Sequence, residues 1–191
     1  MNLLSITEIE ARTREYGEDW AVAHVQRLLR LIDRIATGLE YDQEVITWSV
    51  YLHDWGAFPR YYQPGCDHAL LSKQVAESEI LPQTGLPADK KAKILDAIAL
   101  HDYRDRRPVA STEALLLREA DFLDFLGAIG IAREFAKGPK NIQKSYQQLL
   151  KRRDEIKDRF TLPQAKKMAE ERLARMDVFF AYLLEESFGY I

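Results

Sequence analysis

The sequence is poor in residues that cross-link or interrupt a chain. Its single cysteine, Cys66, excludes an intrachain disulfide framework and is compatible with a reducing cytosol. Glycine and proline are few, 9 and 7 in 191 residues, and they cluster between periodic segments, where they act as breakers. No alternation of apolar and polar residues is long enough to predict a strand. These absences favour an all-α protein.

Three further absences bear on location and partners. No run approaches the roughly 18 uninterrupted apolar residues that a membrane-spanning helix needs. The first ten residues lack the basic flank and apolar run of a signal peptide. The formal net charge is -3, so overall charge does not indicate binding to a nucleic acid polymer. We therefore expect a cytoplasmic protein with no membrane and no nucleic acid partner.

Apolar residues make up 47% of the chain, enough for one domain with a substantial core. They repeat with helical periodicity. The predicted helices over 141–157 and 163–187 are amphipathic and contain neither histidine nor cysteine. We expect a single helical domain over 1–191, with its core at about 20–136 and packing helices at about 141–188 that favour a homodimer. The predicted helices span 5–16, 19–38, 42–54, 67–80, 89–101, 112–126, 127–137 (a continuation or a separate helix), 141–157 and 163–187.

The helix over 42–54 is apolar on most sides and ends in two polar residues, His53 and Asp54. Each needs a partner once it leaves water, and a divalent cation is such a partner. His24 lies at the margin of an apolar stripe, and Asp121 lies within a strongly apolar helix. Imidazole nitrogen and carboxylate oxygen suit Mn, Fe, Co, Ni and Zn, and side chains from facing helices build metal sites in helical bundles.

Two more histidines, His68 and His101, stand at predicted helix ends. They would complete a second site, with Asp54 as the bridge between two ions. Two ions about 3.5–4 Å apart can position and activate a water for attack on phosphorus.

Simpler roles exist for each of these residues. His53 and Asp54 can form a hydrogen-bonded helix end, and His24 can be a core histidine whose hydrogen bonds are satisfied. Asp121 can pair with a buried arginine. His68 and His101 can contact substrate phosphate or cap helices without binding a metal.

The ordered set resembles the HD superfamily of metal-dependent phosphohydrolases. The matching residues are His24, His53-Asp54, His68, His101 and Asp121. Their contexts also match: LHDWG at 52–56, DHALLS at 67–72 and EADFLDFLGAIG at 119–130. The similarity covers roughly residues 20–136. The chain departs from the family at Ala57, where many members carry a lysine, and at Glu119, which replaces the first acid of the final motif.

The resemblance implies an HD-type helical bundle with one or two divalent ions (Mn, Mg, Fe, Co, Ni or Zn). It implies that His24, His53, Asp54 and Asp121 bind one ion and that His68 and His101 help to bind a second. Asp54, His68 and His101 are the expected catalytic residues. The expected reaction is hydrolysis of a phosphoester or phosphoanhydride, in a nucleotide or a small phosphorylated metabolite, by a metal-activated water.

Arginine suits substrate phosphate, because its planar guanidinium matches phosphate oxygens. The phosphate-orienting role of the missing lysine is either lost or taken up by Arg60. Arg104 follows closely on His101, where it would bind substrate phosphate or belong to a solvated loop. Two alternatives remain open. A smaller branch of the family with the same six residues resembles di-iron oxygenases, and a non-catalytic regulator that binds metal or nucleotide is the other.

Overall fold

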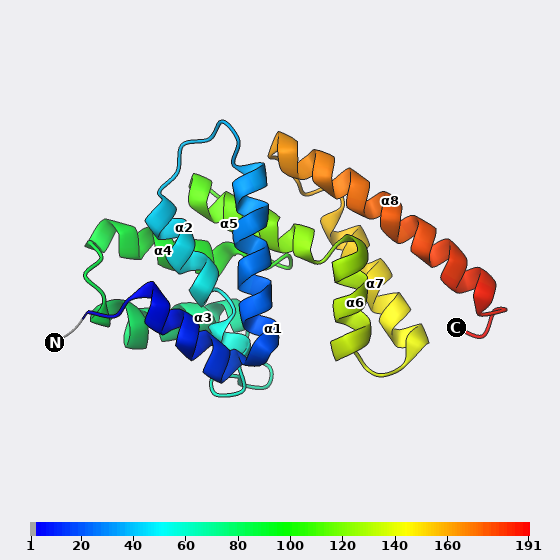
Figure 1. The fold of residues 1–191 in the computed structure, drawn as a ribbon, viewed down its shortest axis with the longest axis horizontal. Coiled ribbons are helices and arrows are strands. Elements are labelled where there is room, and N and C mark those ends of the chain that lie inside the picture. Colours follow the sequence, from blue (N-terminus) through cyan, green and yellow to red (C-terminus); the bar gives the residue numbers. More distant parts are fainter. Residues whose placement is uncertain (1–2) are drawn as a thin grey trace. The chain divides into compact units, whose positions relative to one another are not determined.

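The computed structural model describes residues 3–191, apart from the side chain of residue 19, and its regular elements are all helices (Figure 1). The expected all-α fold is confirmed. The chain divides into two compact units, Met1–Arg118 and Glu119–Ile191. A single domain over the whole chain stays a prediction.

Helix α1 (Ile6–Ile35) consists of two helical segments that meet at a kink. Ser5 caps the first segment, and the kink falls at Glu18, which adopts φ 59° and ψ -175°. At Gly17 a Cβ atom would lie 2.5 Å from the Phe58 ring. Glycine therefore lets the Phe58 side chain pack against the kink, and the predicted break between 16 and 19 is confirmed.

The centre of the first unit is α2 (Gln43–Leu52), which packs against α1 and α4 (Ala88–Leu100). Asp42 caps α2 by accepting hydrogen bonds from two backbone amides of its first turn. Each buried large aliphatic side chain contributes about 1.5–3 kcal/mol to stability. The fully buried aliphatic residues of this core include Leu28, Ile32, Val45, Ile46, Val50, Leu52, Ile94 and Ile98.

The chain after α2 turns sharply through η1 (Trp55–Ala57) onto α3 (His68–Val75). The amide of Gly56 donates to Ser72 Oγ at 2.8 Å. A Cβ atom at Gly56 would collide with the His68 carbonyl and lie 2.6 Å from Leu71 Cβ. This close approach fixes the end of α2 against the first turn of α3.

Asp67 caps helix α3, and the chain continues through a π turn, η2 (Ala76–Ile80), and a short 3-10 turn, η3 (Leu81–Gln83). Helix α5 (Thr112–Asp124) starts in the first unit, where Ser111 Oγ accepts from the backbone amide of Ala114. The boundary between the units falls inside α5, after Arg118.

The second unit contains α6 (Gly127–Lys137), α7 (Ile142–Ile156) and α8 (Pro163–Glu186). Gly127 has φ +70°, which separates α6 from α5 and decides the question that the sequence left open. Helix α6 packs against α7 and α8. The buried Glu119 carboxylate accepts from the backbone amides of residues 161 and 162 and so holds the start of α8.

Among the described residues, no helix combines the length and apolar character that a bilayer-spanning segment requires.

Candidate metal centre

The carboxylate of Asp54 lies between two pairs of histidines. Its Oδ2 atom is 3.4 Å from His53 Nε2 and 3.6 Å from His24 Nε2. Its Oδ1 atom is 3.4 Å from His68 Nε2 and 3.7 Å from His101 Nε2. Each oxygen of one side chain thus faces its own pair of imidazoles.

Four α-helices of the first unit supply these residues. His24 comes from α1, His53 and Asp54 directly follow α2, His68 opens α3, and His101 directly follows α4. Three of the histidines are 1% exposed, whereas the side chain of His68 is 24% exposed. The group is therefore closed on the α1 side and open to solvent at His68.

The backbone sets the tautomer of two histidines. His53 Nδ1 donates to the Val50 carbonyl at 2.8 Å, and His101 Nδ1 donates to the Ile98 carbonyl at 2.7 Å. A carbonyl only accepts, so each Nδ1 carries a proton. With Nδ1 so engaged, a neutral imidazole has a lone pair on Nε2 that can bind a cation, and a protonated imidazole has an N–H there that can donate to the Asp54 carboxylate.

Within each pair the Nε2 atoms are only 3.2 Å apart, in His24–His53 and in His68–His101. Two imidazole nitrogens at this distance need a proton or a cation between them. His53, Asp54 and His101 each offer a ligand atom within 4.8 Å of the others. This donor set of nitrogen and carboxylate oxygen fits a first-row divalent cation.

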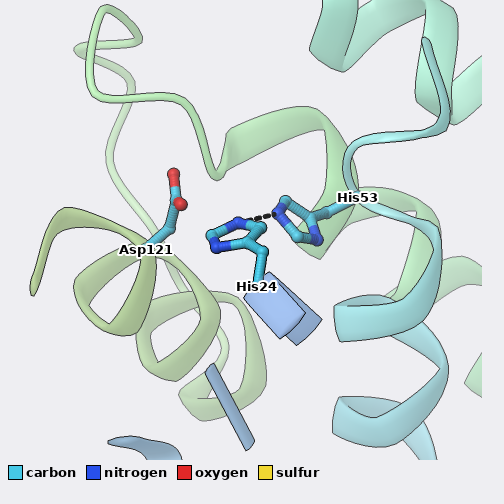
Figure 2. A group of neighbouring side chains, drawn as sticks. All are labelled: His24, His53 and Asp121. Carbon is cyan, nitrogen blue, oxygen red and sulfur yellow. Dashed lines mark hydrogen bonds between the residues drawn. The ribbon is translucent and has the colours of Figure 1, made fainter. Parts of the chain in front are cut away.

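Asp121 is buried on α5, the helix that begins in the first unit. Two contacts hold that beginning: Glu113 Oε1 accepts from the Asp42 amide at 3.0 Å, and Arg118 Nε donates to the Leu100 carbonyl at 2.6 Å. Asp121 follows one helical turn beyond Arg118. Figure 2 draws its carboxylate with the imidazoles of His24 and His53, the two histidines that the sequence groups with Asp121.

The charge of Asp54 is set by its neighbours. Burial alone would raise the pKa of this carboxyl group. The facing imidazole of His53 and the hydrogen bonds from His101, His53 and His68 outweigh burial and hold its pKa well below the ordinary value. Asp54 is therefore ionised at neutral pH.

Sequence reasoning missed Asp102, which is 4% exposed and contacts His68. Its Oδ2 atom lies 3.3 Å from His68 Nδ1. Arg104 donates to the same carboxylate through Nε and Nη2, and its Nη2 lies 3.0 Å from His68 Nδ1. Burial would raise the pKa of Asp102, but Arg104 lowers it below the ordinary value. One signal was visible: His101-Asp102 is a second His-Asp dipeptide.

The two predicted phosphate-binding arginines have different surroundings. The Arg104 side chain is 57% exposed beside His68. The Arg60 guanidinium lies 4.7 Å from the centre of the Tyr16 ring. It also lines a cavity of about 210 Å³ together with Tyr61 and residues of α3. Substrate binding by both arginines stays a prediction.

Asp124 lies one helical turn after Asp121, a position suited either to support a ligand histidine or to form a structural ion pair. It is 1% exposed, and Arg133 Nη1 donates to its Oδ2 at 2.6 Å. This contact within the second unit favours the structural ion pair.

The chain is similar in sequence to one curated protein and in fold to several solved structures. No protein-family model matches the chain. It is 28% identical over 171 residues to the uncharacterized protein YpgQ of Bacillus subtilis, covering 82% of this chain and 78% of that protein.

Solved structures of similar fold include a predicted HD superfamily hydrolase from an uncultured Thermotogales bacterium. It has a TM-score of 0.66 and 27% identity over 95% of this chain and 90% of that one. The structure of Bacillus subtilis YpgQ in complex with ADP gives a TM-score of 0.70 and 20% identity over 95% and 94%. An HD-superfamily hydrolase from Bacillus thuringiensis gives 0.62 and 22% over 95% and 93%.

Proposed function

We propose that this chain, which belongs to the HD-domain proteins, is a metal-dependent phosphohydrolase. It has the fold of the HD superfamily hydrolases. The proposed reaction is hydrolysis of a phosphoester or phosphoanhydride bond in a nucleotide or a small phosphorylated metabolite.

One observation carries the proposal: the two oxygens of Asp54 face separate pairs of histidines, at 3.4–3.6 Å and at 3.4–3.7 Å. A carboxylate in this position suits a bridge between two cations. We propose that His24, His53 and Asp121 hold one ion with Asp54, and that His68 and His101 hold the other. Bound divalent cations would supply Lewis acidity, which makes water a stronger acid and neutralises charge on phosphoryl oxygens.

The protein's own residues shape the rest of the proposed reaction. The backbone carbonyls that accept from His53 and His101 keep both imidazoles in one tautomer and orientation. Burial of three histidines excludes bulk water from the α1 side. Substrate would approach from the open side, where the partly exposed His68 and the exposed Arg104 lie.

The phosphate of the substrate needs positive partners on that side. Arg104 is proposed to contact it while remaining paired with Asp102. Arg60 is proposed to contact a more distant part of the substrate from its cavity. A nucleotide is supported by the similar fold of Bacillus subtilis YpgQ, which was solved in complex with ADP.

The direct test is phosphate or pyrophosphate release from a panel of nucleotides and phosphomonoesters, with Mn²⁺ or Mg²⁺ and without oxygen. Wild-type protein should turn over at least one compound. Asp54→Asn should lose at least about 100-fold in rate, because loss of a residue that only supports a metal ligand already costs about 10–100-fold. Asp33→Asn, at an exposed carboxylate on α1, is the matched control and should keep wild-type turnover.

Equal turnover by wild type and Asp54→Asn would refute the proposal. Turnover that requires iron and oxygen would support the oxygenase alternative instead. Tight nucleotide binding without turnover under any metal would identify a regulator.

A further inference from the structure

The exposed apolar surface of this protein is concentrated at its C-terminal end. Ten large apolar side chains are exposed among the described residues, and half of them lie between positions 178 and 190. These five are Val178, Tyr182, Leu184, Phe188 and Tyr190. Scattered apolar residues on a surface need no explanation, but Val178 and Tyr182 lie one helical turn apart on one face of α8.

Five exposed residues of α8 recur at alternating steps of four and three, which is the spacing of a helix-pairing seam. They are Glu171, Arg175, Val178, Tyr182 and Glu185. The small residues Ala174 and Ala181 flank the seam and are also exposed, so a partner helix can approach closely. The buried residues of α8, Ala165, Ala169, Met176 and Phe180, occupy the opposite face.

We propose that this seam pairs two copies of the chain through an antiparallel α8–α8 contact with two-fold symmetry. In the register centred on Phe180, Val178 packs on the partner's Tyr182, and Tyr182 on the partner's Val178. The same register places Glu185 opposite the partner's Arg175, and Arg175 opposite the partner's Glu185. One alignment therefore satisfies both the apolar and the charged positions.

The charged residues of the seam favour the antiparallel pair over a parallel pair of the same helices. In a parallel pair Arg175 would face the partner's Arg175, and Glu185 would face the partner's Glu185. Like charges across a helix interface disfavour that form. The seam of one copy is therefore complementary to the seam of a second copy only when the two helices run antiparallel. This is the property of a two-fold interface between identical chains.

Reversing the charges of Glu185 and Arg175 tests the register. Dimerisation of the full-length chain is measured by analytical ultracentrifugation. Wild-type protein should sediment as a concentration-dependent dimer. Glu185→Arg and Arg175→Glu should each raise the dimer dissociation constant at least tenfold, because each sets like charges opposite each other. The double variant should restore dimerisation. Glu170→Arg, on the same helix but outside the seam, should leave the wild-type constant unchanged.

Loss of apolar contact gives a second measurement on the same surface. Val178→Asp should abolish the dimer, whereas Ile142→Asp, at an apolar side chain of similar exposure on α7, should not. Circular dichroism confirms that each variant keeps its helix content.

Cysteine cross-linking reports the direction of the helices. In a Cys66→Ser background, a mixture of Val178→Cys and Tyr182→Cys chains should oxidise to the mixed disulfide in preference to either self-linked species. A monomeric wild type overturns the proposal. So does a dimer that tolerates both Val178→Asp and the single charge reversals, or one that links each cysteine to itself. All three readouts are independent of hydrolase activity.

Discussion

The side chain of Asp54 joins two histidine pairs because its two oxygens point in different directions. If each oxygen serves its own ion, the two ions can be removed separately. We expect wild-type protein to retain two Mn²⁺ per chain after dialysis, and His68→Gln to retain one, since His24, His53 and Asp121 are untouched. Metal analysis of the dialysed protein measures this. Retention of two ions by His68→Gln would contradict a role for His68 as a ligand.

Asp102 holds His68 from the side opposite Asp54. Because its carboxylate lies 3.3 Å from His68 Nδ1 and holds Arg104 beside the same nitrogen, Asp102→Asn should weaken the second ion about 10–100-fold and leave the first unchanged. Calorimetric titration with Mn²⁺ resolves the two steps. Asp105→Asn is the matched control: Asp105 belongs to the same loop and also pairs with an arginine, Arg107. Equal effects of the two variants would indicate a general change in the loop.

The same carboxylate predicts a pH dependence of stability in metal-free protein. Arg104 lowers the folded-state pKa of Asp102, so its stabilising contribution is complete above the unfolded pKa of about 3.9. The contribution is lost as the pH falls through the lower folded pKa. Urea unfolding at pH 6 and pH 3 should therefore show a smaller stability difference between wild type and Asp102→Asn at pH 3. A difference that does not change with pH would contradict this contribution.

The gathering of His24, His53, Asp54, His68 and His101 could be predicted from the sequence, because each stands at a helix end or on a core-facing stripe. Their role as metal ligands stays a prediction. Asp102 could not be found in this way. It lies in a charged loop, and a loop carboxylate is normally solvated unless tertiary contacts bury it.

At the scale of elements, the turn from α2 to α3 decides where Asp54 sits relative to His68. Gly56→Ala should destabilise the protein by about 1–3 kcal/mol, because the added methyl overlaps the backbone and Leu71 of α3. It should also weaken metal binding, since His68 moves with α3. Urea unfolding and Mn²⁺ titration measure the two effects.

Gly65→Ala is the control that separates backbone strain from the steric overlap expected for Gly56→Ala. Gly65 has φ +81°, and a methyl group added there would meet no atom within 4 Å, so its substitution costs only the left-handed backbone penalty of about 1–2 kcal/mol. It should leave metal affinity unchanged. Equal metal affinity in both variants would show that the α2–α3 turn does not position the site.

Most helices and their caps followed from local chemistry. Ser5, Asp42, Asp67, Ser111 and Asn141 cap their helices with side-chain oxygens that accept from first-turn amides, as these residue types commonly do. The π turn of η2 was not predicted, because its residues read as a regular continuation of α3. Its path depends on packing, which periodicity alone does not encode.

For the whole molecule, a bound metal that joins α1, α2, α3 and α4 must stabilise the folded state of the first unit by mass action. At a free concentration 100 times the dissociation constant, one ion adds about 2.7 kcal/mol. For a chain of this size that raises the melting temperature by about 5–10 °C. Thermal unfolding with Mn²⁺ should show this shift for wild type and not for Asp54→Asn. An equal shift in both proteins would place metal binding elsewhere.

The all-α architecture followed from composition and periodicity. The division into two compact units did not, because its boundary falls inside α5 at no glycine, proline or change of composition. Only tertiary contacts distinguish the two halves of that helix.

The central claim is that Asp54 bridges two cations, and anomalous diffraction from crystals grown with Mn²⁺ tests it most directly. We expect two anomalous peaks, one at each oxygen of Asp54, the first shared with His24 and His53 and the second with His68 and His101. A map with no peak at Asp54 would contradict the claim.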